Sequence, residues 1–401
     1  MKLYYRAMTH DSKTIRGLIE AKDEREAAYY LRKHQLIPIK IIPSAKTGIA
    51  RFFPFLRRTT GGDLIFFTRQ LASMLNAGLT LMQALTILKN QIQNPIMSDA
   101  VYGIVSGVEN GKTFSSAIEK YPNIFSPIYI ALIRSAESSG LLDKVLVRLA
   151  DNLDKQQKLK NTIKSALLYP AIIVAMMIVV IIIMMVFVVP QLTTLYQGLN
   201  ASLPLPTVII VSLSKFIINF WLVIIASLVI GSYYFRKWYK KESGRRTVDG
   251  YLLKLPIFGK LLMETMMAEF SRSFGILVSS GSLVVDSLIR SSDVVNNVHY
   301  KQAILLVAKR VEKGIAIGNA MEASPLFPPM VVEMVKIGEQ TGKLDESLIK
   351  VSEYYEREVD QTVKTLTTLL EPIIMIILAV GVGFLIIAVI TPIYNLLQSI
   401  R

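Results

Sequence analysis

The stretch Pro170-Ala-Ile-Ile-Val-Ala-Met-Met-Ile-Val-Val-Ile-Ile-Ile-Met-Met-Val-Phe-Val-Val189 contains no charged residue, no glycine and no asparagine. A helix of about 20 residues, rising 1.5 Å per residue, crosses a hydrocarbon layer roughly 30 Å thick. In lipid, only a helix satisfies every backbone polar group of a single segment. Because the stretch is apolar on every face, it predicts a transmembrane helix rather than a buried helix of a soluble protein.

The composition of the whole chain agrees with a membrane protein. Hydrophobic residues make up 52% and charged residues 19% of the 401 positions, compared with about 45–50% and about 25% in soluble domains. Cysteine is absent, which excludes disulfides and thiolate metal sites. The net charge of +15 lies mostly at the ends of apolar stretches, which is typical of membrane flanks rather than of a nucleic-acid-binding face. Residues 1–6 lack the apolar core of a cleavable signal peptide.

The first 45 residues predict a small α/β module. We expect strands at 3–8 and 14–21, a short helix after Asp23-x-x-Glu26, and an edge strand at 37–42 that tolerates Pro38. Residues 46–63 form a linker that contains Arg51-Phe52-Phe53-Pro54-Phe55-Leu56-Arg57-Arg58. That segment either meets a membrane interface or partner, or packs on the next domain, and we favour the packing interpretation.

A unit of roughly 100 residues then occurs twice, which indicates an internal repeat. The first half of the unit repeats at an offset of 203, with these pairs: Arg69 and Arg272, Gly78 and Gly281, Gly111 and Gly314. After a one-residue gap the offset is 202, with these pairs: Glu137 and Glu339, Gly140 and Gly342, Asp143 and Asp345, Pro170 and Pro372. Each copy predicts a helical domain that runs into a membrane span.

These patterns divide the chain into successive segments. They are a module (1–45), a linker (46–63), helical repeat 1 (64–164), a span (165–190), a loop (191–214), a second span (215–235), a basic connector (236–263), helical repeat 2 (264–371), a third span (372–396) and a short C-terminus (397–401). Lys and Arg flank the spans on the side of both repeats, so the N-terminus and both repeats are expected to be cytoplasmic. The loop 191–214 and the C-terminus are expected to be external.

Signatures of catalysis or cofactor binding are not visible. Gly107-Val-Glu-Asn-Gly111-Lys112-Thr113 resembles a phosphate loop but is one residue short, because Ser106 occupies the position that needs glycine. The three histidines are far apart in sequence, and no nucleophile and base are suitably spaced. The spans contain no charged residue inside them, which argues against an ion pathway. We expect no enzyme activity, no cofactor and no metal.

The repeated Glu-x-x-Gly turn holds the main candidate polar residues. Glu137 and Glu339 either contact a partner or order the glycine turn, or they hydrogen-bond locally at a helix end. Gly140 and Gly342 are expected to end helices in the left-handed conformation. Asp143 and Asp345 are expected to cap the helices that follow.

Further motifs give the chain a family resemblance. They are Lys164-Ser-Ala-Leu-Leu-Tyr169-Pro170, Leu255-Pro256-x-x-Gly259 and Glu371-Pro372. Together with the duplicated turns, they resemble the bacterial type II secretion F family over essentially the whole chain. Repeat 1 departs from the family pattern at Ala136, where repeat 2 has Gly338 and the family often has glycine.

The resemblance implies a mainly α, multi-pass membrane protein with two cytoplasmic six-helix bundles, three transmembrane helices, an N-terminal module and self-association. It implies an inner-membrane platform of type II secretion, type IV pilus assembly or competence systems, without enzyme activity of its own. The implied partners are a cytoplasmic hexameric ATPase, pilin-like subunits and other assembly proteins. The alternatives are a membrane scaffold for signalling proteins or an oligomeric transporter.

Overall fold

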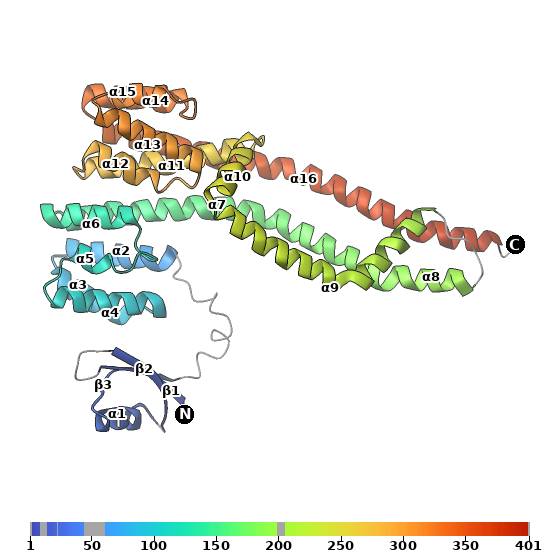
Figure 1. Ribbon diagram of the computed structural model, residues 1–401, viewed down its shortest axis with the longest axis horizontal. Coiled ribbons are helices and arrows are strands. Elements are labelled where there is room, and N and C mark those ends of the chain that lie inside the picture. The colour runs from blue at the N-terminus through green and yellow to red at the C-terminus, as the bar shows by residue number, and fades with distance from the viewer. Residues whose placement is uncertain (1, 9–13, 22, 44–60, 199–204, 400–401) are drawn as a thin grey trace.

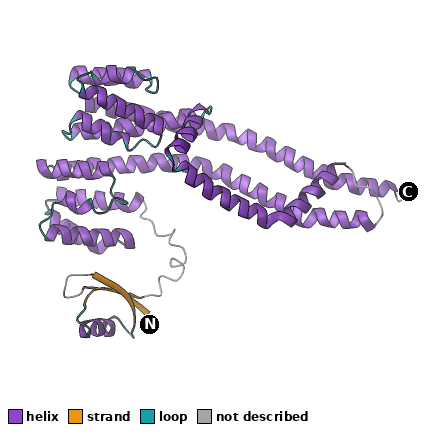
Figure 2. Cartoon of the chain, viewed as in Figure 1, coloured by secondary structure: helices purple, strands orange, loops and turns teal. Residues whose placement is uncertain are grey.

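The computed structural model describes residues 2–8, 14–21, 23–43, 61–198 and 205–399 of the chain. The molecule is elongated, with two helical bundles and a small sheet at one end and long helices extending from the bundles toward the other (Figure 1). Figure 2 shows that strands occur only in the N-terminal module of this described part, and helices form the rest.

The N-terminal module has the predicted α/β order. Strands β1 (Lys2–Met8), β2 (Thr14–Glu20) and β3 (Ile37–Pro43) form an antiparallel sheet in the order β2-β1-β3. Helix α1 (Glu24–Lys33) buries Ala27 and Leu31, and the Asp23 carboxylate accepts from the Glu26 amide at 2.7 Å. Pro38 lies in β3 at the edge of the sheet, where a missing N–H costs little. The aromatic segment 51–58 lies outside the described residues.

Bundle 1 consists of six helices, as the family resemblance implies. They are α2 (Gly61–Asn76), α3 (Leu81–Gln91), α4 (Pro95–Glu109), α5 (Phe114–Ile118), α6 (Pro127–Ser139) and α7 (Leu142–Ile183). Phe67 and Leu71 of α2, at helical spacing, are buried in one core with Tyr129 of α6 and with Phe125 from the turn before α6. Thr80 begins α3 with a capping box to Gln83.

Bundle 2 repeats this arrangement helix by helix. It consists of α11 (Phe258–Ser279), α12 (Val284–Ser292), α13 (Val298–Glu312), α14 (Ile317–Glu322), α15 (Pro329–Thr341) and α16 (Leu344–Ser399). The six repeated glycines that end helices in the two bundles all have φ between 70° and 88°, namely Gly78, Gly111, Gly140, Gly281, Gly314 and Gly342. A side chain is disfavoured in that region, so these turns require glycine.

Both bundles continue directly into long apolar helices. Helix α7 passes through Pro170, then a π-helical turn η3 (Met184–Val188) and α8 (Val189–Gly198). Helix α9 (Leu205–Tyr239) returns, α10 (Glu242–Lys254) joins it to bundle 2, and α16 runs through Pro372. Among the described residues, three helices are long and apolar enough to cross a membrane: Leu142–Gln191, Val208–Tyr239 and Leu344–Gly383.

The segment 191–214, expected to be a loop, is largely helical. Pro190 is the second residue of α8, which continues directly from η3, and the Val189 amide just before it donates to the Met184 carbonyl in the wider π-helical pattern. Helix α9 already begins at Leu205. The Ser214 hydroxyl donates to the Met185 carbonyl within η3, which ties the returning helix to the first span.

Candidate functional site

Glu137 and Glu339 perform the same task in the two bundles. The Glu137 carboxylate accepts from the Phe114 amide at 2.6 Å, the Ser115 amide at 3.0 Å and the Ser115 hydroxyl at 2.7 Å. The Glu339 carboxylate accepts from the Ile317 amide at 2.9 Å and the Gly318 amide at 3.2 Å. Each carboxylate therefore caps the N-terminus of the short helix α5 or α14.

This arrangement corrects two of the three sequence interpretations of the two glutamates, the local hydrogen bond and the ordering of the glycine turn, whereas contact with a partner stays a prediction. The prediction of a local hydrogen bond at a helix end is wrong, because the amides that the carboxylates accept from lie on another helix, 21–23 residues earlier in the chain. The prediction that the glutamates order the glycine turn is also wrong, because backbone hydrogen bonds form that turn. Gly140 and Gly342 both have φ of 70°, and the following amides donate to the carbonyls of Ala136 and Gly338.

Asp143 and Asp345 do not cap the helices in which they lie. The N-cap of α7 is Leu141, which has no side-chain cap hydrogen bond, so Asp143 is the second residue inside the helix. Asp345 likewise lies in the first turn of α16. At these positions a carboxylate interacts favourably with the helix dipole but does not occupy the capping position.

The repeated arginines form equivalent ion pairs in different surroundings. Arg69 on α2 pairs with two residues of α7, Asp151 at 3.1 Å and Asp154. The Arg69 side chain is 48% exposed. Arg272 on α11 pairs with Glu356, which is equivalent to Asp154 at the offset of 202, but the Arg272 side chain is 3% exposed. Burial lowers the Arg272 pKa to about 10, against the opposing charges of neighbouring carboxylates.

The difference in burial arises because bundle 1 covers this face of bundle 2. The Ser135 hydroxyl donates to the Ser280 carbonyl at 3.0 Å, and Arg148 donates to the Ser279 hydroxyl at 3.1 Å. Lys155 on α7 pairs with Glu353 on α16 at 3.3 Å. Ile276 and Leu277 of α11 belong to the core of bundle 1. An open groove of about 490 Å³ with charges of both signs remains between the bundles.

Sequence reasoning missed Asp249, which joins the second span to bundle 2. Its side chain is 3% exposed although it lies in a strongly basic segment. It accepts from the Val298 amide at the start of α13 at 2.9 Å and from the Tyr239 hydroxyl at the end of α9 at 3.2 Å. Arg245 approaches the same carboxylate at 3.8 Å. The sequence signal for this joint was that Asp249 is one of two acidic residues, with Glu242, in the basic segment 236–254.

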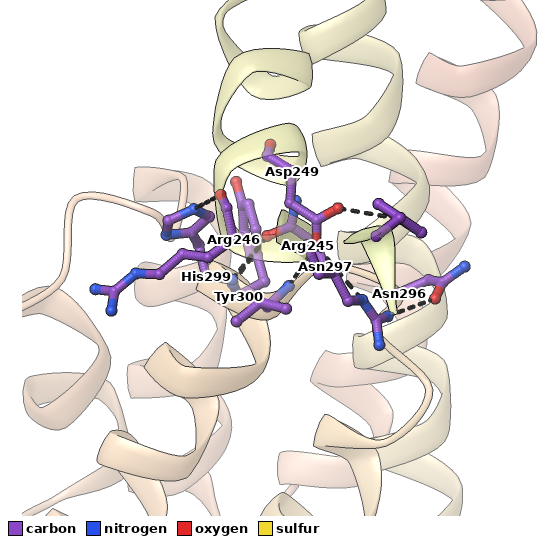
Figure 3. A network of polar contacts seen from close by, with 9 residues as sticks. Arg245, Arg246, Asp249, Asn296, Asn297, His299 and Tyr300 are labelled. Carbon is purple, nitrogen blue, oxygen red and sulfur yellow. Dashed lines mark hydrogen bonds and ion pairs between the residues drawn. The ribbon is translucent and has the colours of Figure 1, made fainter. Parts of the chain in front are cut away.

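Neighbouring contacts strengthen the joint between α10 and α13. Arg245 donates to the Asn296 side chain at 2.9 Å, and the His299 ring meets the Arg246 carbonyl at 3.0 Å (Figure 3). Asn297 caps α13 and also donates to the Asp249 carbonyl at 3.4 Å. The predicted connector, 236–263, therefore contains the end of α9, the whole of α10 and the start of α11, and α10 is attached to bundle 2 by these contacts.

The motif residues near the membrane form no cluster with the repeated turns. Pro170 and Pro372 lie inside continuous helices, and Tyr169 and Glu371 are exposed beside them. Thr113, at the end of the glycine-rich segment 107–113, caps α5, so this segment is a turn between helices. Within the described ranges, no group of three or more His, Cys, Asp or Glu side chains is placed to hold a metal ion.

Comparison with known proteins agrees with the repeat and the module. The family model "Type II secretion system (T2SS), protein F" matches residues 67–190 and 270–392, and the model of that protein's N-terminal domain matches residues 4–42. "Type IV pilus assembly protein PilC" of Thermus thermophilus is 36% identical, over 99% of this chain and 98% of that protein. The protein of that name from Pseudomonas aeruginosa is 35% identical, over 92% and 97%. "Type II secretion system protein F" of Vibrio cholerae is 27% identical, over 98% and 97%. The chain therefore belongs to the type II secretion system protein F family.

Proposed function

We propose that this protein is the inner-membrane platform of a type IV pilus or type II secretion machine. In this role it couples a cytoplasmic assembly ATPase to the extraction of pilin-like subunits from the membrane. The observation that carries the proposal is the continuity of α7 and α16, each of which is one helix from its bundle into an apolar span. The names of full-length relatives, which refer to pilus assembly and to type II secretion, support the same role.

Continuous helices suit a mechanical role because a helix transmits rotation and translation along its axis with little bending. Bundles 1 and 2 pack on each other, and α7 and α16 remain in contact below them through Leu159, Val359 and Val363. A displacement of either bundle would therefore move the spans together. The Asp249 joint extends this coupling to α9, because its hydrogen bonds connect the end of that helix to α13.

The proposal places both bundles and the N-terminal module in the cytoplasm. Lys155, Lys158, Lys160 and Lys164 precede the first span, and Arg236 and Lys237 follow the second. On this orientation the ATPase meets the bundles, and pilin-like subunits meet the spans. The protein needs no catalytic centre or cofactor of its own, since the ATPase supplies the energy.

Helix-breaking insertions test whether continuity matters. Four glycines inserted between Leu167 and Leu168 would interrupt α7 just beyond its packing with α16, at a cost of about 1 kcal/mol each relative to alanine. Four alanines at the same site preserve the helix and rotate it by only about 40° beyond a full turn. We expect the glycine variant to lose filament assembly while the full chain in nanodiscs still binds the ATPase. We expect the alanine variant to retain most assembly.

The outcomes separate the proposal from its alternatives. Equal filament assembly by the glycine and alanine variants would refute transmission through α7. Failure of the folded, unaltered chain to bind the ATPase of its own genome would favour a membrane scaffold for signalling proteins. Solute flux in liposomes that contain only this protein would favour a transporter.

A further inference from the structure

The contact between the two bundles is head-to-tail, which leaves one face of each bundle without its counterpart. Bundle 1 contributes Ser135 and Arg148 from α6 and α7, and bundle 2 contributes Ser280 and Ser279 from the end of α11. A twofold contact would also bring the equivalents of Ser135 and Ser280 together. Those equivalents are Ile337 in bundle 2, which is 50% exposed, and Ala77 in bundle 1, which is also exposed. The contact is therefore heterologous.

We propose that a second copy of this chain docks its bundle 2 on bundle 1 and repeats the contact made within the chain. The donor face is formed by α15 and α16 around Ile337, Tyr354 and Arg357. The acceptor face is formed by α2 and α7 around Arg69, Ala77 and Asp151. The inference concerns assembly alone and does not depend on the proposed coupling to an ATPase.

The charges of the two free faces match those of the contact already formed. Within the chain, Lys155 of bundle 1 meets Glu353 of bundle 2 at 3.3 Å. At the offset of 202, the equivalent of Lys155 is Arg357 and the equivalent of Glu353 is Asp151. The positive charge of the donor face and the negative charge of the acceptor face are therefore both retained. An Arg357–Asp151 pair between copies would reproduce the Lys155–Glu353 pair.

The surroundings of Asp151 leave room for such a partner. Glu353 lies between Lys155 of the other bundle and Arg272 of its own bundle, whose pKa it affects through its charge. Asp151 has the equivalent arginine of its own bundle, Arg69, at 3.1 Å and remains 58% exposed. Arg357 is exposed, and its side chain makes no hydrogen bond or ion pair in the part of the chain that the structure describes. Its side chain is available to take the position that Lys155 takes at Glu353.

The apolar part of the donor face also fits. Ser135 donates to the Ser280 carbonyl within the chain, whereas the equivalent pair between copies joins Ile337 to Ala77. Both are apolar, so contact would remove the half-exposed Ile337 side chain from water. Tyr354, 37% exposed on the same face, is equivalent to Asn152, which is 5% exposed at the existing contact. Burying such apolar surface is favourable by about 25 cal/mol per Å².

The direction of the long helices makes this contact compatible with a membrane. Helices α7 and α16 leave their bundles in the same direction and lie beside each other (Figure 1). Repeating the same step therefore keeps every bundle on one side of the bilayer and every span within it. A heterologous contact closes into a ring or continues as a row, depending on its rotation.

Cysteine cross-linking of the full chain tests the proposal, because the natural sequence has no cysteine. Differently tagged Ala77→Cys and Ile337→Cys chains are mixed in nanodiscs or liposomes and treated with a short thiol-specific cross-linker. We expect a dimer that carries both tags. Ser135→Cys with Ser280→Cys in one chain is the positive control, and Glu119→Cys mixed with Ile337→Cys is the mismatched control.

Charge exchange tests the same contact independently. Asp151→Lys or Arg357→Glu alone should lower the cross-linking yield of the mixed dimer roughly tenfold, and the two together should restore it. Two results would overturn the proposal. One is no mixed dimer while the positive control reacts, and the other is cross-linking only between identical positions, which indicates a twofold contact. Neither result would alter ATPase binding, so this inference and the proposed function can fail separately.

Discussion

Removing the Glu339 carboxylate should open helix α14 without unfolding bundle 2. Glu339 accepts two backbone amides, at 2.9 Å and 3.2 Å, and α14 has no other side-chain cap because its N-cap is Ala316. A hydrogen bond to a charged group contributes about 1.5–3 kcal/mol. Water reaches this partly buried site and replaces part of the loss, so we expect Glu339→Ala to cost about 3 kcal/mol locally.

Hydrogen exchange of the full chain in nanodiscs measures this local opening directly. A cost of about 3 kcal/mol corresponds to roughly a 100-fold loss of protection at the amides of Ile317 and Gly318. Glu339→Gln keeps one acceptor oxygen and should lose less. In bundle 1, Glu137→Ala should open α5 less fully, because Thr113 still accepts from the Ser116 amide at 3.3 Å.

The matched control for this prediction is Glu333→Ala on the same helix, α15. Glu333 is 63% exposed and pairs only with Lys336 among the described residues, so α14 should keep its protection. Protection of Ile317 and Gly318 that stays within about threefold of the unaltered chain in Glu339→Ala would refute the capping role. A loss of protection throughout bundle 2 would instead mean that α14 opens only with the whole domain.

Three further substitutions have distinct expected outcomes. Gly338→Ala should destabilise bundle 2 by about 1–3 kcal/mol, because the new Cβ would lie 2.9 Å from the Ser347 side chain, and a shifted thermal transition of the purified chain would reveal it. Asp249→Asn should speed hydrogen exchange of the Val298 amide several-fold, because the hydrogen bond from that amide to the residue 249 side chain loses its charge assistance. The amides of α14 should keep their protection. Burial raises the pKa of Glu269, so this carboxyl binds a proton more readily in the folded protein than in the unfolded chain. The folded protein therefore loses stability as the pH rises from about 4.5, the ordinary pKa, through the raised pKa of the folded state. Glu269→Gln should therefore raise the melting temperature at pH 7 but not at pH 4, and a lower melting temperature at pH 7 would contradict this.

The sequence by itself determined the architecture, because the signals that specify it are local or periodic. An uninterrupted apolar stretch such as 170–189 has few alternatives to a membrane-spanning helix. The repeat at offsets of 203 and 202 predicted two equivalent helical units, and Gly140 and Gly342 marked a turn whose left-handed backbone requires glycine. The helices from α3 to α7 then begin at positions equivalent to the starts of α12 to α16.

Only the tertiary structure decided what the polar side chains contact. Glu137 reaches amides 22 and 23 residues away, and Asp249 connects helices 10 and 49 residues away, which no local spacing reveals. The same limit applies to Arg69 and Arg272, which occupy equivalent positions but differ in exposure, 48% against 3%, because one bundle covers the other. Burial and pairing depend on which surfaces pack together, and packing is a property of the whole fold rather than of a segment.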